Sequence, residues 1–248
     1  MTAAFQLEGV SLARDGRVLL EGVDLQVAEG STLALVGPSG SGKTTLLRTI
    51  LGLEVPSQGT IAVMGRTAST AGRILVPAED RRIAIVFQDL GLWPHMSVGE
   101  HLDFALSGQR VPRADRAARI RRMLQSVGLE GRTRQRPATL SGGERQRLAI
   151  ARALVTEPSI ILLDEPFSNL DIVLKQELVA LLAALITERP VTTILVSHDL
   201  EEALPLTADF AVLESGRIVQ RDTVVELARS PTTPFVRALV AHTERDRQ

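Results

Sequence analysis

The glycine-rich segment GPSGSGKTT constrains the fold of this chain more than any other stretch of the sequence. It follows STLALVG, a short apolar run typical of a buried strand, and precedes KTTLLRTILGL, whose apolar residues recur at helical spacing. Glycine loses more backbone freedom on folding than other residues, so a cluster of glycines needs a compensating gain. The spacing of Gly37 and Gly42-Lys43-Thr44 matches G-x-x-x-x-G-K-[ST], a loop that cradles phosphates.

Such a loop has the chemistry of a triphosphate site. Its glycines let consecutive backbone N–H groups approach an anion, and the helix starting near Lys43 adds its positive end. We expect Lys43 to reach the β- and γ-phosphates and the Thr44 hydroxyl to bind Mg²⁺. A turn without ligand is the alternative, but the flanking strand and helix favour a nucleotide site. The residues predicted here to bind ATP are Gly37, Pro38, Ser39, Gly40, Ser41, Gly42, Lys43, Thr44 and Thr45.

The segment IILLDEP supplies the acidic residues that such a site needs. Four apolar residues place Asp164 at the end of a buried strand, where it can hold Mg²⁺ through water. Glu165 is the predicted general base for an attacking water, a role typically worth about 10²–10⁴-fold in rate. The alternative is an Asp-Glu pair at a helix N-terminus.

A second anion site is predicted in LSGGERQRLAIARAL. Ser141 and Glu144 have the spacing of a capping box, and the two glycines between them leave backbone N–H groups open at a helix N-terminus. Taken alone, this pattern fits a capping box without ligand equally well.

Composition limits the class of protein. The 248 residues have a net charge of −1, which argues against nucleic-acid binding, and they include no cysteine, which excludes disulfides. The longest apolar run, LVALLAALI, is about half a membrane span. The N-terminus lacks the pattern of a signal peptide. We therefore expect a soluble, cytoplasmic chain whose role at a membrane is indirect.

Strand and helix patterns alternate, which predicts an α/β fold with a mostly parallel sheet covered on both faces. We expect one domain with a catalytic core of about residues 1–90 and 153–225. An inserted helical subdomain is expected at about 91–152, and a short C-terminal tail at 226–248. The Ser-Gly dipeptide in AVLESGRIVQRD predicts a hairpin.

The chain resembles the nucleotide-binding subunits of ATP-binding cassette (ABC) transporters. Its motifs occur in the family order: GPSGSGKTT, VFQ, LSGGERQR, IILLDEP, SNLD and SHD. The similarity runs from about Phe5 to about Val240. The resemblance implies a P-loop ATPase core with a small antiparallel N-terminal β subdomain and the inserted helical subdomain.

The resemblance also implies a site shared by two subunits, with each ATP held between the P-loop of one and the signature of the other. A homodimer is the simplest such pair. Gln88 would sense Mg²⁺ and the attacking water, while His198 would contact the γ-phosphate and hold Glu165 productively. The residues expected to act on the partner's ATP are Ser141, Gly142, Gly143 and Asp171. Without the family, His198 reads as a capping or core histidine, and Asp171 as a helix N-cap.

The sequence departs from the family at the residue that stacks on adenine, often a tyrosine, because this chain has none. Arg14 occupies the matching position, and a guanidinium can stack on a purine. Phe5 aligns less well. A solvated turn arginine is the alternative for Arg14.

EDRRIAIVFQDLGLWPHMSVGEHL and DEPFSNLD resemble the binding-protein-dependent importers of iron, polyamines, sugars, sulfate, molybdate and thiamine, without their C-terminal regulatory domain. That likeness implies permease subunits docking on the Gln88–His101 region, an extracytoplasmic solute-binding protein as indirect partner, and a place at the cytoplasmic face of the membrane. Trp93 is expected to be an exposed anchor or a core residue. Arginines 113, 116, 119, 121 and 122 would form a solvated helix face or touch lipid headgroups. An exporter subunit is the main alternative function; a ribosome- or nucleic-acid-associated ATPase and a catalytically silent module fit the motifs less well.

Overall fold

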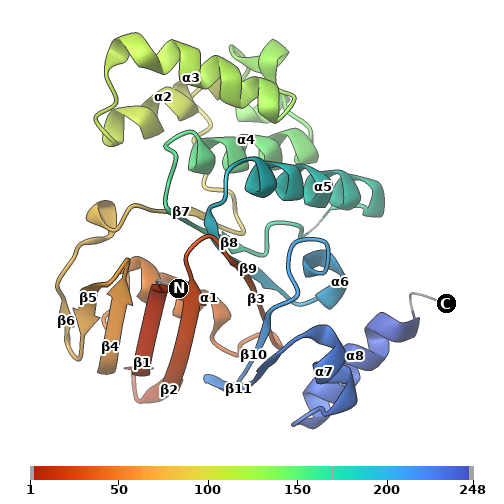
Figure 1. Cartoon of the computed structure of the whole chain (residues 1–248). Coiled ribbons are helices and arrows are strands. Elements are labelled where there is room, and N and C mark those ends of the chain that lie inside the picture. The colour runs from red at the N-terminus through yellow and green to blue at the C-terminus, as the bar shows by residue number, and fades with distance from the viewer. Residues whose placement is uncertain (1–2, 169, 246–248) are drawn as a thin grey trace.

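The computed structural model describes residues 3–168 and 170–245, which form two sheets and a set of helices (Figure 1). The smaller sheet is antiparallel, with strand order β2-β1-β4-β5-β6. Its strands are β1 (Ala3–Arg14), β2 (Arg17–Ala28), β4 (Gln58–Val63), β5 (Arg66–Thr70) and β6 (Arg73–Ile74). The expected antiparallel β subdomain is therefore present.

The larger sheet has the order β11-β10-β3-β9-β8-β7. Its members β3, β7, β8, β9 and β10 pair in parallel, and β11 closes one edge as the second strand of the predicted hairpin. These strands are β3 (Thr32–Val36), β7 (Ile83–Val86), β8 (Ile160–Asp164), β9 (Thr192–Ser197), β10 (Phe210–Glu214) and β11 (Arg217–Asp222). Every residue of β8 and β9 is buried, as expected for strands covered on both faces.

Different helices cover the two faces of this sheet. Helix α1 (Lys43–Leu51) packs with one face and with the antiparallel sheet. The opposite face is covered by α4 (Gly142–Leu154), α5 (Ile172–Glu188), α6 (Leu200–Ala203), α7 (Val224–Arg229) and α8 (Pro234–Arg245). The segment expected as a tail thus forms two helices, because Leu227, Val236 and Val240 bury their side chains in this core.

A third apolar core lies in the helical part of the chain. Helices α2 (Val98–Gly108) and α3 (Arg113–Ser126) pack on α4, which also covers the sheet, so α4 joins the two parts (Figure 1). Short 3-10 turns complete the chain at Ala78–Asp80, Glu130–Arg132 and Pro137–Thr139.

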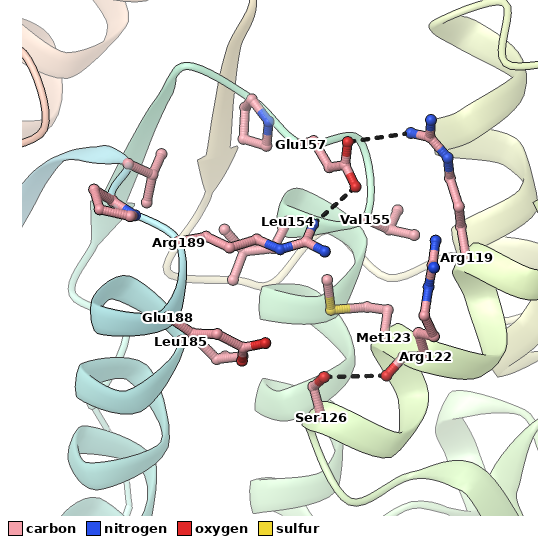
Figure 2. Close-up of a pocket in the computed structure, with 13 residues that line it drawn as sticks. Arg119, Arg122, Met123, Ser126, Leu154, Val155, Glu157, Leu185, Glu188 and Arg189 are labelled. Carbon is pink, nitrogen blue, oxygen red and sulfur yellow. Dashed lines mark hydrogen bonds and ion pairs between the residues drawn. The ribbon is translucent and has the colours of Figure 1, made fainter.

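The arginine-rich face of α3 is partly engaged within the chain. Glu157, in the loop before β8, lies between Arg119 at 3.5 Å and Arg189 at 2.8 Å (Figure 2). Arg116 donates to the carbonyl of Val111 at 2.8 Å. Ion pairs this exposed contribute little individually, so apolar packing carries the attachment of α3.

Trp93 organises the loop between β7 and α2. It is 37% exposed, and its ring contacts His101, Phe104 and the guanidinium of Arg152. His101 is fully buried; its Nε2 accepts the backbone N–H of Trp93 at 3.0 Å, and its Nδ1 lies 2.8 Å from the carbonyl of Ser97. The ring is therefore neutral with its proton on Nδ1, and burial lowers the pKa of His101.

This arrangement predicts a pH-dependent stability. Unfolded histidine binds a proton near pH 6.5, but buried His101 resists it, so stability is intact above about pH 6.5 and falls as the pH drops below it. We expect the free energy of urea unfolding, followed by the fluorescence of the single tryptophan, to decrease from pH 7.5 to 5.5. The slope should be shallower in H101Q; equal slopes in the two proteins would contradict the assignment.

Candidate functional site

The ends of three neighbouring strands bring most of the predicted residues to one edge of the larger sheet. In the parallel ladder, Val36 pairs with Ser197, and Asp164 pairs with the residue before Ser197. The phosphate-type loop, Glu165 and His198 therefore all begin at the same edge. Ligand sites of open α/β sheets form at this carboxyl edge.

The loop between β3 and α1 requires glycine at defined positions. A Cβ on Gly37 would lie 2.1 Å from the carbonyl oxygen of Leu213, so only glycine fits this close approach. Gly40 and Gly42 have φ of 78° and 106°. Gly42 is the N-cap of α1 and gives no side-chain cap, which leaves the first N–H groups of the helix available to an anion.

Two side chains at this loop, those of Lys43 and Ser41, are suited to binding an anion. The Nζ of Lys43 donates to the carbonyls of Gly37 at 2.8 Å and Pro38 at 3.0 Å. Burial lowers the pKa of Lys43, and the charges of Glu165 and Asp164 oppose that shift. The buried hydroxyl of Ser41 has no hydrogen-bond partner within the described residues, and a phosphate oxygen would satisfy it. Thr44 is exposed beside these groups, and Ser39 and Thr45 complete the loop.

Thr44 and Asp164 come together across the edge of the sheet. The Thr44 hydroxyl donates to Asp164 Oδ1 at 3.1 Å, and Asp164 is only 4% exposed. Burial raises the pKa of Asp164, although the Thr44 hydrogen bond opposes this. One hydroxyl and one carboxylate are hard oxygen ligands, and Mg²⁺ is typically held by few such protein groups plus substrate phosphates and water.

Glu165 and Gln88 form a second pair. Gln88, two residues beyond β7, donates from Nε2 to Glu165 Oε2 at 3.3 Å. Glu165 adopts a left-handed backbone with φ of 48°, a conformation that costs a non-glycine residue energy. Its carbonyl accepts the N–H of Ser168 at 3.2 Å and the hydroxyl at 3.0 Å, which holds the turn.

His198 follows β9 with its side chain exposed. No hydrogen bond or ion pair of its imidazole occurs within residues 3–168 and 170–245, so neither interaction joins it to Glu165. The next residue, Asp199, caps α6 by accepting the N–H of Glu201 at 2.9 Å. The family-based interaction of His198 with Glu165 therefore stays a prediction.

The signature segment lies apart from the phosphate-type loop. Ser141 and Glu144 form the predicted capping box at the start of α4, with Gly142 and Gly143 as its first two helical residues. Helices α1 and α4 cover opposite faces of the sheet, and the start of α4 lies against the first turn of α5, where a Cβ on Gly143 would be 3.0 Å from Leu174. Asp171 caps α5 by accepting the N–H of Leu174 at 3.0 Å.

The guanidinium of Arg14 has a partner that its sequence context did not indicate. Arg14 ends β1 and forms an ion pair with Glu54, which follows α1. This hydrogen bond raises the pKa of Arg14. Half of the Arg14 side chain stays exposed, so its use as a stacking surface stays a prediction.

Sequence reasoning missed Arg81, which is 3% exposed. Its guanidinium donates to the carbonyl of Ala68 at 3.1 Å, to the hydroxyl of Ser69 at 2.6 Å and to the carbonyl of Ile50 at 2.5 Å. It thereby satisfies the C-terminal end of α1, whose N-terminus carries Lys43. The segment EDRR gives no signal for such a role.

Together, the parallel sheet and the glycine loop define a P-loop ATPase, as predicted. Comparison with known proteins identifies the type of P-loop ATPase. The sequence pattern described as ABC transporter matches residues 20–168. The solved dimeric post-hydrolysis state of the ATP-binding cassette MJ0796 bound to ADP and Pi is 30% identical, with a TM-score of 0.77, and covers 88% of this chain and 98% of that chain.

Curated relatives are import ATP-binding proteins. The sulfate/thiosulfate protein CysA of Thermosynechococcus vestitus is 42% identical over 94% of this chain and 68% of its own length. The spermidine/putrescine protein PotA of Oleidesulfovibrio alaskensis is 41% identical over 95% of this chain and 62% of its own length. The Fe(3+) protein FbpC 1 of Rhodococcus jostii is 44% identical over 93% of this chain and 65% of its own length. The chain thus spans about two thirds of the length of these relatives.

The chain belongs to the ABC transporter family. Within it, the chain groups with the ATP-hydrolysing subunits of importers, as the motifs predicted. Members of this family bind ATP, and the solved neighbour of 30% identity is dimeric. In the described part of the chain, no helix combines the length and apolar character needed to cross a membrane.

The close approach at Gly37 predicts a large effect of one added carbon. We expect G37A to lower the free energy of unfolding by at least about 2 kcal/mol, because the Cβ must displace the Leu213 backbone. G108A is the matched control, since a Cβ there meets nothing within 4 Å. It should change stability by less than about 1 kcal/mol. Urea denaturation measures both, and similar losses in the two variants would contradict this account.

Proposed function

We propose that this chain hydrolyses ATP as one half of a paired, energy-coupling ATPase beneath an importer permease at the cytoplasmic face of the membrane. The observation that carries this proposal is the convergence of Lys43, Thr44, Asp164, Glu165 and Gln88 at one sheet edge. These groups supply phosphate contacts, cation ligands and a general base within one site.

The chain's own residues divide the chemistry between them. Lys43 and the N–H groups of the glycine loop bind the β- and γ-phosphates. Thr44 and Asp164 would hold Mg²⁺, which neutralises charge on the phosphates when bound. Glu165 accepts the proton of the attacking water, and Gln88, already 3.3 Å from it, helps to orient both.

A second copy of the chain completes the site in this proposal. The N-terminus of α4, with Ser141, Gly142 and Gly143, belongs to a helix on the opposite face of the sheet from α1. This helix N-terminus can bind an anion, and in the proposed dimer it would bind the γ-phosphate of the partner's ATP. Asp171 would reach toward the partner's phosphate loop, and His198 would contact the γ-phosphate, which completes the shared site.

The permease would dock on the loop and helix between Gln88 and His101. Support comes from a groove lined by Trp93, Phe104 and Arg152, which also includes residues of β7. A half-exposed aromatic ring backed by rigid neighbours is a common interface anchor. An extracytoplasmic binding protein would act only through the permease.

The transported solute is not set by this subunit. Relatives named for sulfate, spermidine and Fe(3+) are similar to this chain to nearly the same degree, from 41% to 44%. We infer that the permease and its binding protein choose the solute.

Replacing the base tests the mechanism and the pairing together. We expect E165Q to lower kcat at least about 10²-fold and to accumulate as an ATP-bound dimer in size-exclusion chromatography. E226Q, on the exposed face of α7, is the charge-matched control and should behave as the parent. Normal hydrolysis by E165Q would refute the base, and a strictly monomeric E165Q with ATP and Mg²⁺ would refute the shared site.

The absence of an aromatic partner for adenine predicts weak base discrimination. We expect kcat/KM for GTP within about tenfold of that for ATP. R14A should raise the KM for ATP about 2- to 30-fold, the equivalent of a cation–π contact of about 0.5–2 kcal/mol. R17A, across the same hairpin, is the control. Strong preference for ATP, or no effect of R14A, would contradict stacking by Arg14.

A further inference from the structure

Glu202 is a buried carboxylate that the proposed mechanism does not use. It lies on α6, and its side chain is 3% exposed, the lowest value for any carboxylate in an ion pair of residues 3–168 and 170–245. Its Oε1 forms an ion pair with Nζ of Lys175 at 2.6 Å that does not have hydrogen-bond geometry, and its Oε2 accepts the Ser197 hydroxyl at 2.5 Å. A buried charge is costly unless it is paired, so these partners fix the carboxylate in place.

The Ser197 hydroxyl links Glu202 to the turn that carries His198. The Ser197 hydroxyl has one proton to donate, and the charged carboxylate of Glu202 is a stronger acceptor than a neutral oxygen. The Ser197 hydroxyl oxygen in turn accepts a hydrogen bond from the backbone N–H of Asp199 at 2.9 Å. Ser197 and Asp199 flank His198, so the Glu202 contact fixes the backbone on both sides of the histidine.

Lys175 extends this chain of contacts to the start of α5. It lies one helical turn after Asp171, and its backbone N–H donates to the Asp171 carbonyl at 2.9 Å. The Asp171 carboxylate caps the same turn. The helix end predicted to reach the partner's phosphate loop is therefore tied, through Lys175, Glu202 and Ser197, to the turn of His198.

We propose that Glu202 and Lys175 are positioning residues that set the orientation of His198 relative to the N-terminus of α5. The inference rests on the proposed function of His198 at the γ-phosphate. Neither residue belongs to the glycine loop or the Thr44–Asp164 pair. Their loss therefore changes the rate of hydrolysis and leaves nucleotide binding as it is.

A double-mutant cycle tests this relation. We expect E202Q and K175M each to lower kcat about 10- to 100-fold, the effect of a displaced catalytic group, with the KM for ATP within twofold of the parent. H198A should lower kcat at least as much. Because Glu202 acts through His198, E202Q should add no further decrease in the H198A background.

Control variants separate positioning from general stability. E177Q breaks the ion pair of Glu177 with Arg147 at 3.0 Å, on the same helix and away from His198, and should keep the parent kcat. K175R keeps the charge and should restore most of the activity lost in K175M. K175M also serves if E202Q fails to fold, since the Lys175 side chain is 30% exposed.

The outcomes distinguish this inference from the function on which it rests. Unchanged kcat in H198A overturns the role of His198, and this inference with it. A decrease in H198A, with unchanged kcat in K175M and E202Q, overturns this inference alone. This inference is also overturned if E202Q lowers kcat in the H198A background by the same factor as in the parent. A loss of activity that does not depend on His198 would be a structural effect.

Discussion

The parallel pairing of β3 with β9 and of β9 with β8 is the constraint on which the site depends. These strands are buried on both faces, so a slip of one residue would exchange the side chains packed against α1 for those packed against α4 and α5. With the register fixed, the glycine loop, Glu165 and His198 leave the sheet at the same level. The geometry of the site thus depends on the apolar packing that fixes the strand register.

The arrangement of helices on this sheet is the basis for the proposal that two chains share one site. A helix N-terminus that binds phosphate must end at the carboxyl edge of the sheet, and α1 does so from one face. Helix α4 covers the other face, and it also carries the helical layer formed with α2 and α3. Its N-terminal glycines therefore start a helix on the face of the sheet that α1 does not cover. Pairing of two chains is the arrangement that brings two such helix ends to one triphosphate.

Local patterns in the sequence predicted what local chemistry determines. The glycine spacing, the apolar strand before Asp164 and the capping box at Ser141 each depend on residues within one element and its flanks, and the structure has each of them. The fold class followed from the alternation of such elements. Residues 226–248, which include the end of α7 and all of α8, were expected as a tail because the burial of these helices depends on a core assembled from distant segments.

Contacts between distant elements could not be predicted in this way. Arg14 meets Glu54 forty residues later, Arg81 reaches the end of α1, and Lys175 meets Glu202 across two elements. In each case the charge is visible in the sequence, but its partner is decided by how β1, α1, α5 and α6 pack. Family motifs name the residues that are predicted to bind ATP, whereas these ion-pair and hydrogen-bond partners lie outside the motifs.

The electrostatics of the site favour a ligand that carries both signs of charge. Burial by the protein lowers the pKa of Lys43 and raises the pKa of Asp164, so the fold disfavours the charged form of each group. A triphosphate brings negative charge to Lys43, and a divalent cation brings positive charge to Asp164. In the proposed site, the two ligands together would offset both effects of burial, whereas either alone would offset only one of them. We therefore expect the affinity of the proposed site for the nucleotide to depend on the cation.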